Sequence, residues 1–113
     1  MGDSRDPVRL ACRFIEANAH LDIALDDIAR AASLSSRGLQ HAFKKQLGTS
    51  PLGYLRQVRL TRAHDELLST TPGRRMTVNE IARHWHFSHH SRFAALYLAT
   101  YGHYPAETLR ERP

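Results

Sequence analysis

The second half of the chain repeats the first, and this repeat constrains the fold more than any other feature of the sequence. The matching segments, 53 residues apart at first and 54 residues apart after one inserted residue, are Ile28-Ala29-Arg30 with Ile81-Ala82-Arg83, Leu34-Ser35 with Phe87-Ser88, Phe43 with Tyr97, Gly48 with Gly102, and Pro51 with Pro105. Core positions, turn residues and helix starts all agree. The repeat therefore predicts a duplicated unit: a short helix, a tight turn, a second helix that ends at a glycine, and a proline at which the next helix begins.

Apolar residues recur at helical spacing almost throughout, and no stretch shows the sustained alternation of a β-strand. We therefore expect an all-α fold with a first helix ending near Asn18 and a loop at Thr70–Arg75. A first helix-turn-helix is expected at about 25–47, a linker helix at about 51–69 and a second helix-turn-helix at about 77–101. The residues expected to face inward are Val8, Cys12, Ile15, Ala19, Leu25, Ile28, Ala29, Ala32, Leu39, Phe43, Leu47, Leu55, Val58, Ala63, Leu67, Leu68, Phe93, Tyr97 and Tyr101.

The charge of the chain is strongly basic, with 16 Lys and Arg against 11 acidic residues in 113 and a pI of about 10.0. A basic surface attracts DNA, RNA or anionic lipid, although a solvated surface without a partner has the same composition. The single cysteine, Cys12, excludes an internal disulfide, and no apolar run approaches the roughly 20 residues of a membrane span. We expect residues 1–6 to be an added leader or a linker that follows a removed domain, and residues 7–113 to form one domain.

The first predicted helix-turn-helix has the polarity of a DNA reader. Its second helix should project its solvent side into the major groove, so that helix must be apolar behind and polar in front. The predicted front carries the base-reading candidates Ser36, Arg37, Gln40 and His41 and the phosphate-binding candidates Lys44 and Lys45. Arginine can form two hydrogen bonds to guanine, and glutamine can form two to adenine. Ser35 at the helix start leaves backbone N–H groups for a phosphate.

The second predicted helix-turn-helix is less polar. Its base-reading candidates are His89, His90, Ser91, Arg92 and Ala95, and Ser88 is a candidate for a phosphate. The positions that repeat Gln40, His41, Lys44 and Lys45 are occupied by Ala94, Ala95, Leu98 and Ala99. We therefore expect unequal roles, in which the first motif supplies most polar readout. The second motif reads one or two bases through its first turn, or contacts thymine methyls through its alanines. An alternative is that Leu98 faces a neighbouring helix or a partner.

The predicted linker helix carries a basic stripe. Arg56, Arg59 and Arg62 recur every three residues, and at least one of them is expected to anchor a phosphate. Arg74 and Arg75 in the predicted loop are further candidates for the DNA backbone. A solvated charged face beside Asp65 and Glu66 is the competing interpretation for Arg59 and Arg62.

The order and spacing of these residues resemble the DNA-binding domain of the arabinose-regulator (AraC/XylS) family over nearly the whole chain. The resemblance rests on Leu25-x-x-Ile28-Ala29, Ser35-x-Arg37-x-Leu39-x-x-x-Phe43, Gly48-x-Ser50-Pro51-x-x-Tyr54-Leu55-Arg56, Val78-x-x-Ile81-Ala82, Phe87-Ser88, Phe93-x-x-x-Tyr97 and Tyr101-Gly102-x-x-Pro105.

The resemblance implies seven helices, with the fourth joining the two helix-turn-helix motifs. It also implies recognition helices in successive major-groove segments, so that groove repeats of about 10 bp give a site near 20 bp. Family base-reading positions fall on Arg37, Gln40 and His41, and near His90, Ser91, Arg92 and Ala95, while a family phosphate contact falls on Arg56.

Four residues depart from the family pattern. His41 stands where arginine is frequent, so we expect its contact with DNA to be weaker and pH-dependent. Ala95 and Leu98 replace positions that are often basic. His86 replaces the usual turn glycine before Phe87, so that turn is expected to be strained or differently shaped.

Two other classes of function compete with DNA binding. His84, His86, His89 and His90 lie close in sequence, which suggests a zinc, nickel or copper site, but ligands one residue apart in a helix diverge. We predict no metal and no cofactor. The sequence holds no P-loop, GxSxG or paired-acid motif, so we predict no enzyme activity.

The resulting functional prediction is sequence-specific binding of double-stranded DNA for transcription regulation in the bacterial cytoplasm, at the nucleoid, with activation as the commoner family behaviour. RNA polymerase is a candidate partner, and an effector would be bound by a preceding domain. The isolated domain is expected to be monomeric and to bind no membrane. The alternative is a helical protein-interaction module without DNA binding, whose partner affinity would lack the steep salt dependence of phosphate contacts.

Overall fold

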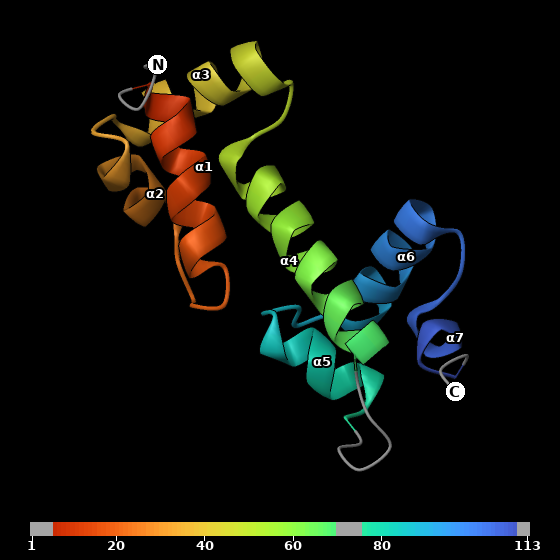
Figure 1. Cartoon of the computed structure of the whole chain (residues 1–113). Coiled ribbons are helices and arrows are strands. Elements are labelled where there is room, and N and C mark those ends of the chain that lie inside the picture. The colour runs from red at the N-terminus through yellow and green to blue at the C-terminus, as the bar shows by residue number, and fades with distance from the viewer. Residues whose placement is uncertain (1–5, 70–75, 111–113) are drawn as a thin grey trace. The chain divides into compact units, whose positions relative to one another are not determined.

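The computed structural model describes residues 6–69 and 76–110. The described residues form seven helices and no strand, which confirms the all-α, seven-helix prediction (Figure 1). The helices are α1 (Pro7–Asn18), α2 (Leu25–Ala31), α3 (Ser36–Leu47), α4 (Pro51–Ser69), α5 (Val78–His84), α6 (His90–Tyr101) and α7 (Pro105–Arg110). The predicted loop with Arg74 and Arg75, and all of the predicted leader or linker except Asp6, lie outside the described residues.

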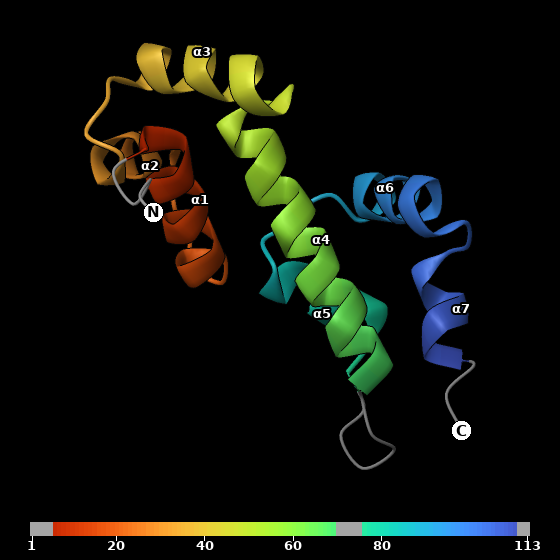
Figure 2. The same cartoon turned by 45° about the horizontal axis from the view of Figure 1, so that its top comes forward.

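The chain divides into two compact units, Met1–Val58 and Arg59–Pro113. Helix α4 is continuous and contributes its first part to one unit and its second part to the other. In the first unit, α1, α2 and α3 contact one another, and Figures 1 and 2 show α3 crossing steeply relative to α1. In the second unit, α5, α6 and α7 contact one another. Each unit therefore has the helices of one copy of the sequence repeat.

The core of the first unit is formed by small and branched apolar side chains around one aromatic ring. Its buried members are Val8, Ala11, Ile15, Ala19, Ile28, Ala29, Ala32, Leu39, Phe43, Pro51 and Leu55. Phe43 meets Tyr54 edge to face, with ring centroids 6.0 Å apart. The prediction that Leu47 faces inward is wrong, since its side chain is 46% exposed. Helix α3 ends at Leu47, and Gly48 then turns the chain in a left-handed conformation (φ 72°).

Cys12 and Tyr54 form a polar edge to this core. Cys12 was expected inside, and its side chain is half-buried. Burial raises the pKa of the Cys12 thiol, and burial together with a hydrogen bond to Glu16 raises the pKa of Tyr54. The Tyr54 hydroxyl donates to the Glu16 carboxylate, which ties α4 to α1 within the first unit.

The core of the second unit repeats this plan with larger aromatic side chains. Its buried members are Leu60, Ala63, Leu67, Ile81, Ala82, Phe93 and Tyr97. Leu60, Ala63 and Leu67 lie 52 residues after Val8, Ala11 and Ile15, so the repeat extends to the first helix of each unit. The sequence analysis missed Leu60 and wrongly placed Leu68 inside; Leu68 is 42% exposed.

A chain of hydrogen bonds runs through the second core. The Tyr97 hydroxyl lies 2.7 Å from His64 Nδ1 and 2.7 Å from Thr108 Oγ1. Thr108 Oγ1 in turn lies 3.3 Å from His103 Nδ1. These residues belong to α4, α6, α7 and the turn between α6 and α7. The hydrogen bonds therefore fix α6 against its neighbouring helices. Burial raises the pKa of Tyr97, so its hydroxyl keeps its proton and remains available as a donor.

We expect Thr108→Val to lower the free energy of unfolding by about 1–3 kcal/mol, because the buried Tyr97 hydroxyl loses a partner while the side-chain volume is kept. Thr108 is 4% exposed. Denaturant unfolding measures the change. Thr100→Val is the matched control, because the exposed Thr100 hydroxyl only bonds the Leu96 carbonyl of its own helix. Its effect should stay within about 0.5 kcal/mol, and equal losses in both variants would contradict this role for Thr108.

Candidate nucleic-acid interface

The turn between the two helices of each motif has the same backbone geometry. Ser33 and His86 both take left-handed conformations, with φ of 57° and 65°. After each of them the chain is closed by a hydrogen bond, from Leu34 N to Ala29 O at 3.0 Å and from Phe87 N to Ala82 O at 2.9 Å. The strain expected at His86 is therefore present as a positive φ, which costs an L-residue roughly 1–2 kcal/mol. The turn shape itself matches that of the first motif.

Side-chain hydrogen bonds fix the start of α3 in the first motif. Ser35 is the N-cap, and its side chain accepts a hydrogen bond from Gly38 N at 3.0 Å. Ser36 Oγ donates to Asp26 Oδ1 of α2 at 2.8 Å. This second bond holds the recognition helix to the supporting helix. Sequence analysis did not identify Asp26 in this role.

The outer face of α3 is polar and basic. Leu39 and Phe43 are buried on its back. Its exposed residues are Arg37, Gln40, His41, Lys44 and Lys45, and within the described part of the chain none of them forms an ion pair. Residues at this spacing lie on one side of a helix, so their side chains are available together to a ligand in front of α3. Ser36 is half-buried, and its hydroxyl hydrogen is engaged by Asp26.

The start of α6 differs from that of α3. Its N-cap is His89, which makes no side-chain cap hydrogen bond. Ser88, which repeats Ser35 in the sequence, precedes the N-cap by one residue. The inserted residue of the repeat thus falls between the turn and α6, and it separates the serine from the helix start.

The outer face of α6 is polar only in its first turn. His90, Ser91 and Arg92 are exposed, and they are followed by the exposed residues Ala95 and Ala99. Leu98 is half-buried. The two recognition helices therefore present different chemistry at equivalent positions.

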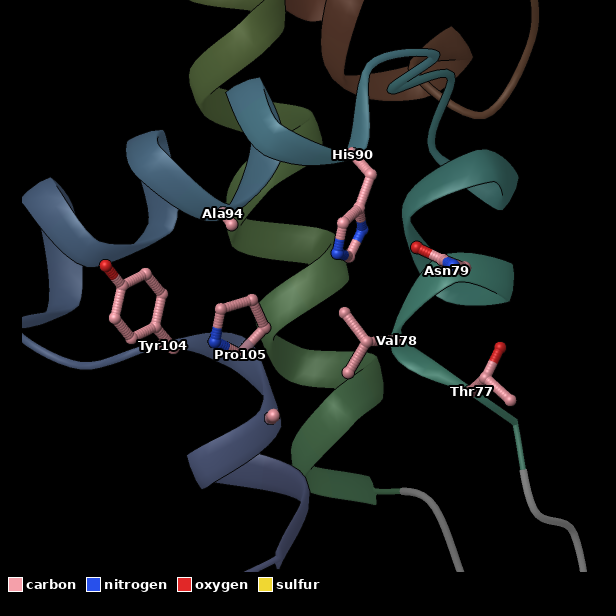
Figure 3. Close-up of a pocket in the computed structure, with 8 residues that line it drawn as sticks. Thr77, Val78, Asn79, His90, Ala94, Tyr104 and Pro105 are labelled. Atoms are coloured by element: carbon pink, nitrogen blue, oxygen red, sulfur yellow. The ribbon is translucent and has the colours of Figure 1, made fainter.

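His90 lies beside a cavity of about 400 Å³ within the second unit (Figure 3). The cavity is lined by Thr77, Val78, Asn79, His90, Ala94, Tyr104, Pro105 and Ala106. Figure 3 shows the His90 ring pointing from the start of α6 toward Val78 and Asn79 of α5. In this position the ring does not continue the stripe of Ala95 and Ala99.

The three arginines of α4 have different surroundings. Arg56 is exposed, whereas Arg59 and Arg62 are half-buried and each interacts with another group of the chain. Of the predicted basic stripe, Arg56 is therefore the residue most available to a phosphate.

Glu66 anchors the second motif from α4. Its Oε1 accepts hydrogen bonds from Trp85 Nε1 at 2.7 Å and from His84 Nδ1 at 3.0 Å. Trp85 is the C-cap of α5, so these bonds hold the residue that leads into the His86 turn. Sequence analysis missed this anchor, because its members are separated by 18 and 19 residues and follow no local pattern.

The described residues contain no group of three or more His, Cys, Asp or Glu side chains placed to hold a metal ion. Among the helices of residues 6–69 and 76–110, none has the length and apolar character of a bilayer span.

Comparison with known proteins identifies relatives along almost the whole chain. A family model described as a helix-turn-helix domain matches residues 28–111. The probable thc operon regulatory protein of Rhodococcus erythropolis is 40% identical over 106 residues, which cover 94% of this chain. The XylDLEGF operon transcriptional activator 2 of Pseudomonas putida is 36% identical over 97 residues, which cover 86% of this chain and 61% of that protein.

A solved structure has the same fold. It is the crystal structure of a probable AraC family transcriptional regulator from Rhodopseudomonas palustris, which is 36% identical and has a TM-score of 0.87. The match covers 96% of this chain and 99% of that one. By contrast, the chain spans 32% of the length of the Rhodococcus erythropolis protein.

Proposed function

This chain belongs to the AraC/XylS family of transcriptional regulators, and we propose that it binds double-stranded DNA sequence-specifically to regulate transcription. The observation that carries the proposal is the outer face of α3. That face follows a helix-turn-helix turn, it is fixed to α2 by Ser36 and Asp26, and it exposes Arg37, Gln40 and His41. A recognition helix requires that its buried side is fixed to the protein and that its polar side is exposed to the DNA. The proposed activity is binding without catalysis.

The residues of the first motif divide into base readers and phosphate anchors. We assign Arg37 to guanine and Gln40 to adenine, because these side chains form paired hydrogen bonds with those bases. His41 is a third base-reading candidate beside them. Lys44 and Lys45, one helical turn further on, are assigned to phosphates, as is Arg56 of α4. Ser35 is also placed near a phosphate, through the backbone N–H groups that follow it.

The second motif is proposed to make fewer polar contacts with DNA than the first. Its first-turn residues are proposed to read one or two bases, and Ser88 to contact a phosphate. The base-reading residues of this turn are His89, His90, Ser91 and Arg92. With the two recognition helices in successive major-groove segments, the whole site is near 20 bp, twice the groove repeat of about 10 bp.

The chain spans 32% of the length of the Rhodococcus erythropolis relative, so the mode of regulation, the protein partners and any effector are proposals about the whole protein. We propose activation as its mode of regulation, because the Pseudomonas putida relative is named a transcriptional activator. RNA polymerase is then the protein partner to test, and an effector would be bound by a further domain. We propose that the protein acts in the cytoplasm, at the nucleoid, where chromosomal DNA lies. The isolated domain is proposed to be monomeric.

A helical module that binds only proteins is the competing function, and salt dependence separates the two. A protein that displaces counterions from Z phosphates loses DNA affinity with a slope of about −0.9Z in log salt. When a fluorescent duplex is titrated at salt concentrations from about 50 to 200 mM, the logarithm of the binding constant should fall steeply with the logarithm of the salt concentration. A chain that binds no duplex at any salt would favour the protein-interaction module.

Arg56→Ala is expected to weaken binding to preferred and scrambled duplexes by the same factor, because a phosphate contact carries no sequence information. The slope of the log binding constant against log salt should become shallower by about 0.9, which is the contribution of one phosphate contact. Fluorescence anisotropy over a salt series measures both quantities. Arg13→Ala removes an equal charge from the exposed side of α1 and serves as the control. An affinity loss confined to the preferred duplex would show that Arg56 contacts a base.

A further inference from the structure

The turn that leads into α6 has a strained backbone and no glycine. His86 takes a left-handed conformation with a φ of 65°, as Ser33 does at the same point of the first motif. A left-handed conformation is unfavourable for any residue with a Cβ atom, so it persists only where the surrounding structure holds it. The contacts around His86 therefore decide the direction in which the chain enters α6.

The two motifs differ in the residue that directly precedes this turn. In the first motif it is Ala32, which is 3% exposed, and in the second it is Trp85, 53 residues later. Both residues are the C-caps of their helices, α2 and α5. Trp85 is half-buried against the second core. An indole ring in this position needs an acceptor for its N–H group, whereas an alanine side chain needs none.

Glu66 of α4 supplies the acceptor. Its Oε1 accepts hydrogen bonds from Trp85 Nε1 at 2.7 Å and from His84 Nδ1 at 3.0 Å. The Glu66 side chain is 24% exposed, and a hydrogen bond to a charged acceptor is stronger than one between neutral groups. Phe14 occupies the equivalent position of the first unit, 52 residues earlier. A phenyl ring and an alanine cannot form such a bond, so this contact belongs to the second motif alone.

We propose that Glu66 is a positioning residue for the second recognition helix. Through Trp85 it holds the His86 turn in its left-handed conformation, so that α6 keeps the orientation in which it meets DNA. The hydrogen bond from Trp85 to Glu66 thus replaces the conformational freedom that a glycine would give this turn. The inference rests on the proposed DNA-binding function and names a residue on which that function depends without contact with the DNA.

Glu66→Met tests the inference, because methionine keeps a long unbranched side chain and a high helix propensity but has no carboxylate. The whole chain is titrated with its preferred duplex, obtained by selection from random sequences. Without the hydrogen bond the turn relaxes, and DNA binding must restore it. We expect the affinity to fall by about 5- to 30-fold, the factor equivalent to the strain of one left-handed residue.

Asp65→Met is the matched control. It removes the same charge at the neighbouring, exposed position of α4. Loss of a negative charge favours association with DNA, so this variant should bind at least as tightly as the unchanged chain. An affinity loss in Glu66→Met is therefore opposite in sign to the electrostatic effect of the substitution.

Two further variants separate positioning from a general loss of structure. His86→Gly removes the strain of the turn, so it should restore most of the affinity lost in Glu66→Met and should gain less in the unchanged chain. Trp85→Phe keeps an aromatic ring against the second core and removes the N–H donor. It should lose affinity in the same way and recover it with His86→Gly, and it carries the test alone if Glu66→Met does not fold.

The outcomes separate this inference from the function on which it rests. Unchanged duplex affinity in Glu66→Met or in Trp85→Phe overturns the role of Glu66 and leaves DNA binding in place. A loss that His86→Gly does not restore also overturns it, because Glu66 would then support the fold of the second unit and not the turn. Failure of the unchanged chain to select or bind any duplex overturns both proposals.

Discussion

Phe43→Ala is expected to lower the free energy of unfolding by about 3–5 kcal/mol, the range for deletion of a buried aromatic ring. Phe43 is fully buried on the back of α3 and meets Tyr54 edge to face. Its loss leaves a cavity in the first core and removes the support that holds the polar front of α3 outward. Denaturant unfolding, followed by circular dichroism, measures the change.

Leu47→Ala is the control for this prediction. The two residues are one helical turn apart on the same helix, and periodicity alone assigns both to the core. Because Leu47 is 46% exposed, its truncation should cost less than about 1 kcal/mol. Similar losses in the two variants would mean that Phe43 does not have the core position described here.

Arg37→Ala is expected to reduce discrimination between preferred and altered sites by roughly 5- to 150-fold, the equivalent of about 1–3 kcal/mol for one bidentate arginine–guanine pair. The loss should be concentrated at one base pair, where guanine is no longer preferred. Competition binding against duplexes altered at single positions measures it. Folding should be unaffected, since Arg37 is exposed and forms no ion pair within the described residues.

Ser91→Ala is the matched comparison in the second motif, because Ser91 follows Arg37 by 54 residues and occupies the equivalent position on α6. It should cost less discrimination, since a serine hydroxyl supplies one weak contact where arginine supplies two. Ala95→Ser should likewise change overall discrimination less than Arg37→Ala does. Equal and small effects in all three variants would contradict the unequal roles of the two motifs.

The sequence was a good guide to the helices because their ends depend on local chemistry. Ser35 accepts the capping hydrogen bond at the start of α3, and Gly48 and Gly102 take the left-handed conformations that end α3 and α6. These residues act within one helical turn of their own positions, and for that reason a short sequence pattern can identify them. The strain at His86 was expected from the family resemblance instead, because His86 stands where a turn glycine is usual, and its φ is positive.

The sequence was a poorer guide to burial along α4. The inward register of this helix changes between Leu55 and Leu60, where α4 passes from the first unit to the second. A single periodic stripe cannot represent that change, so Leu60 was missed and Leu68 was wrongly placed inside. Leu47 was misplaced for a related reason. It keeps the helical periodicity of α3, but it is the last residue of that helix, where the core no longer covers its side chain.

The anchors behind the candidate site were beyond sequence analysis. Ser36 with Asp26, and Glu66 with Trp85, are pairs brought together by folding across 10 and 19 residues. The hydrogen-bonded chain through Tyr97 and Thr108 likewise depends on three-dimensional packing. By contrast, the polarity of α3 and the apolar character of α6 could be read directly, because exposure follows from helical periodicity once the buried side is known.

Selection of duplexes from a random pool at one fixed salt concentration tests the central claim most directly. If the outer face of α3 reads DNA, the bound duplexes should converge on one sequence, bound at least about 10³-fold more tightly than scrambled duplexes. The base preference at one position should disappear when the selection is repeated with Arg37→Ala. Recovery of unrelated sequences with equal affinities, or the same consensus from both proteins, would contradict the claim.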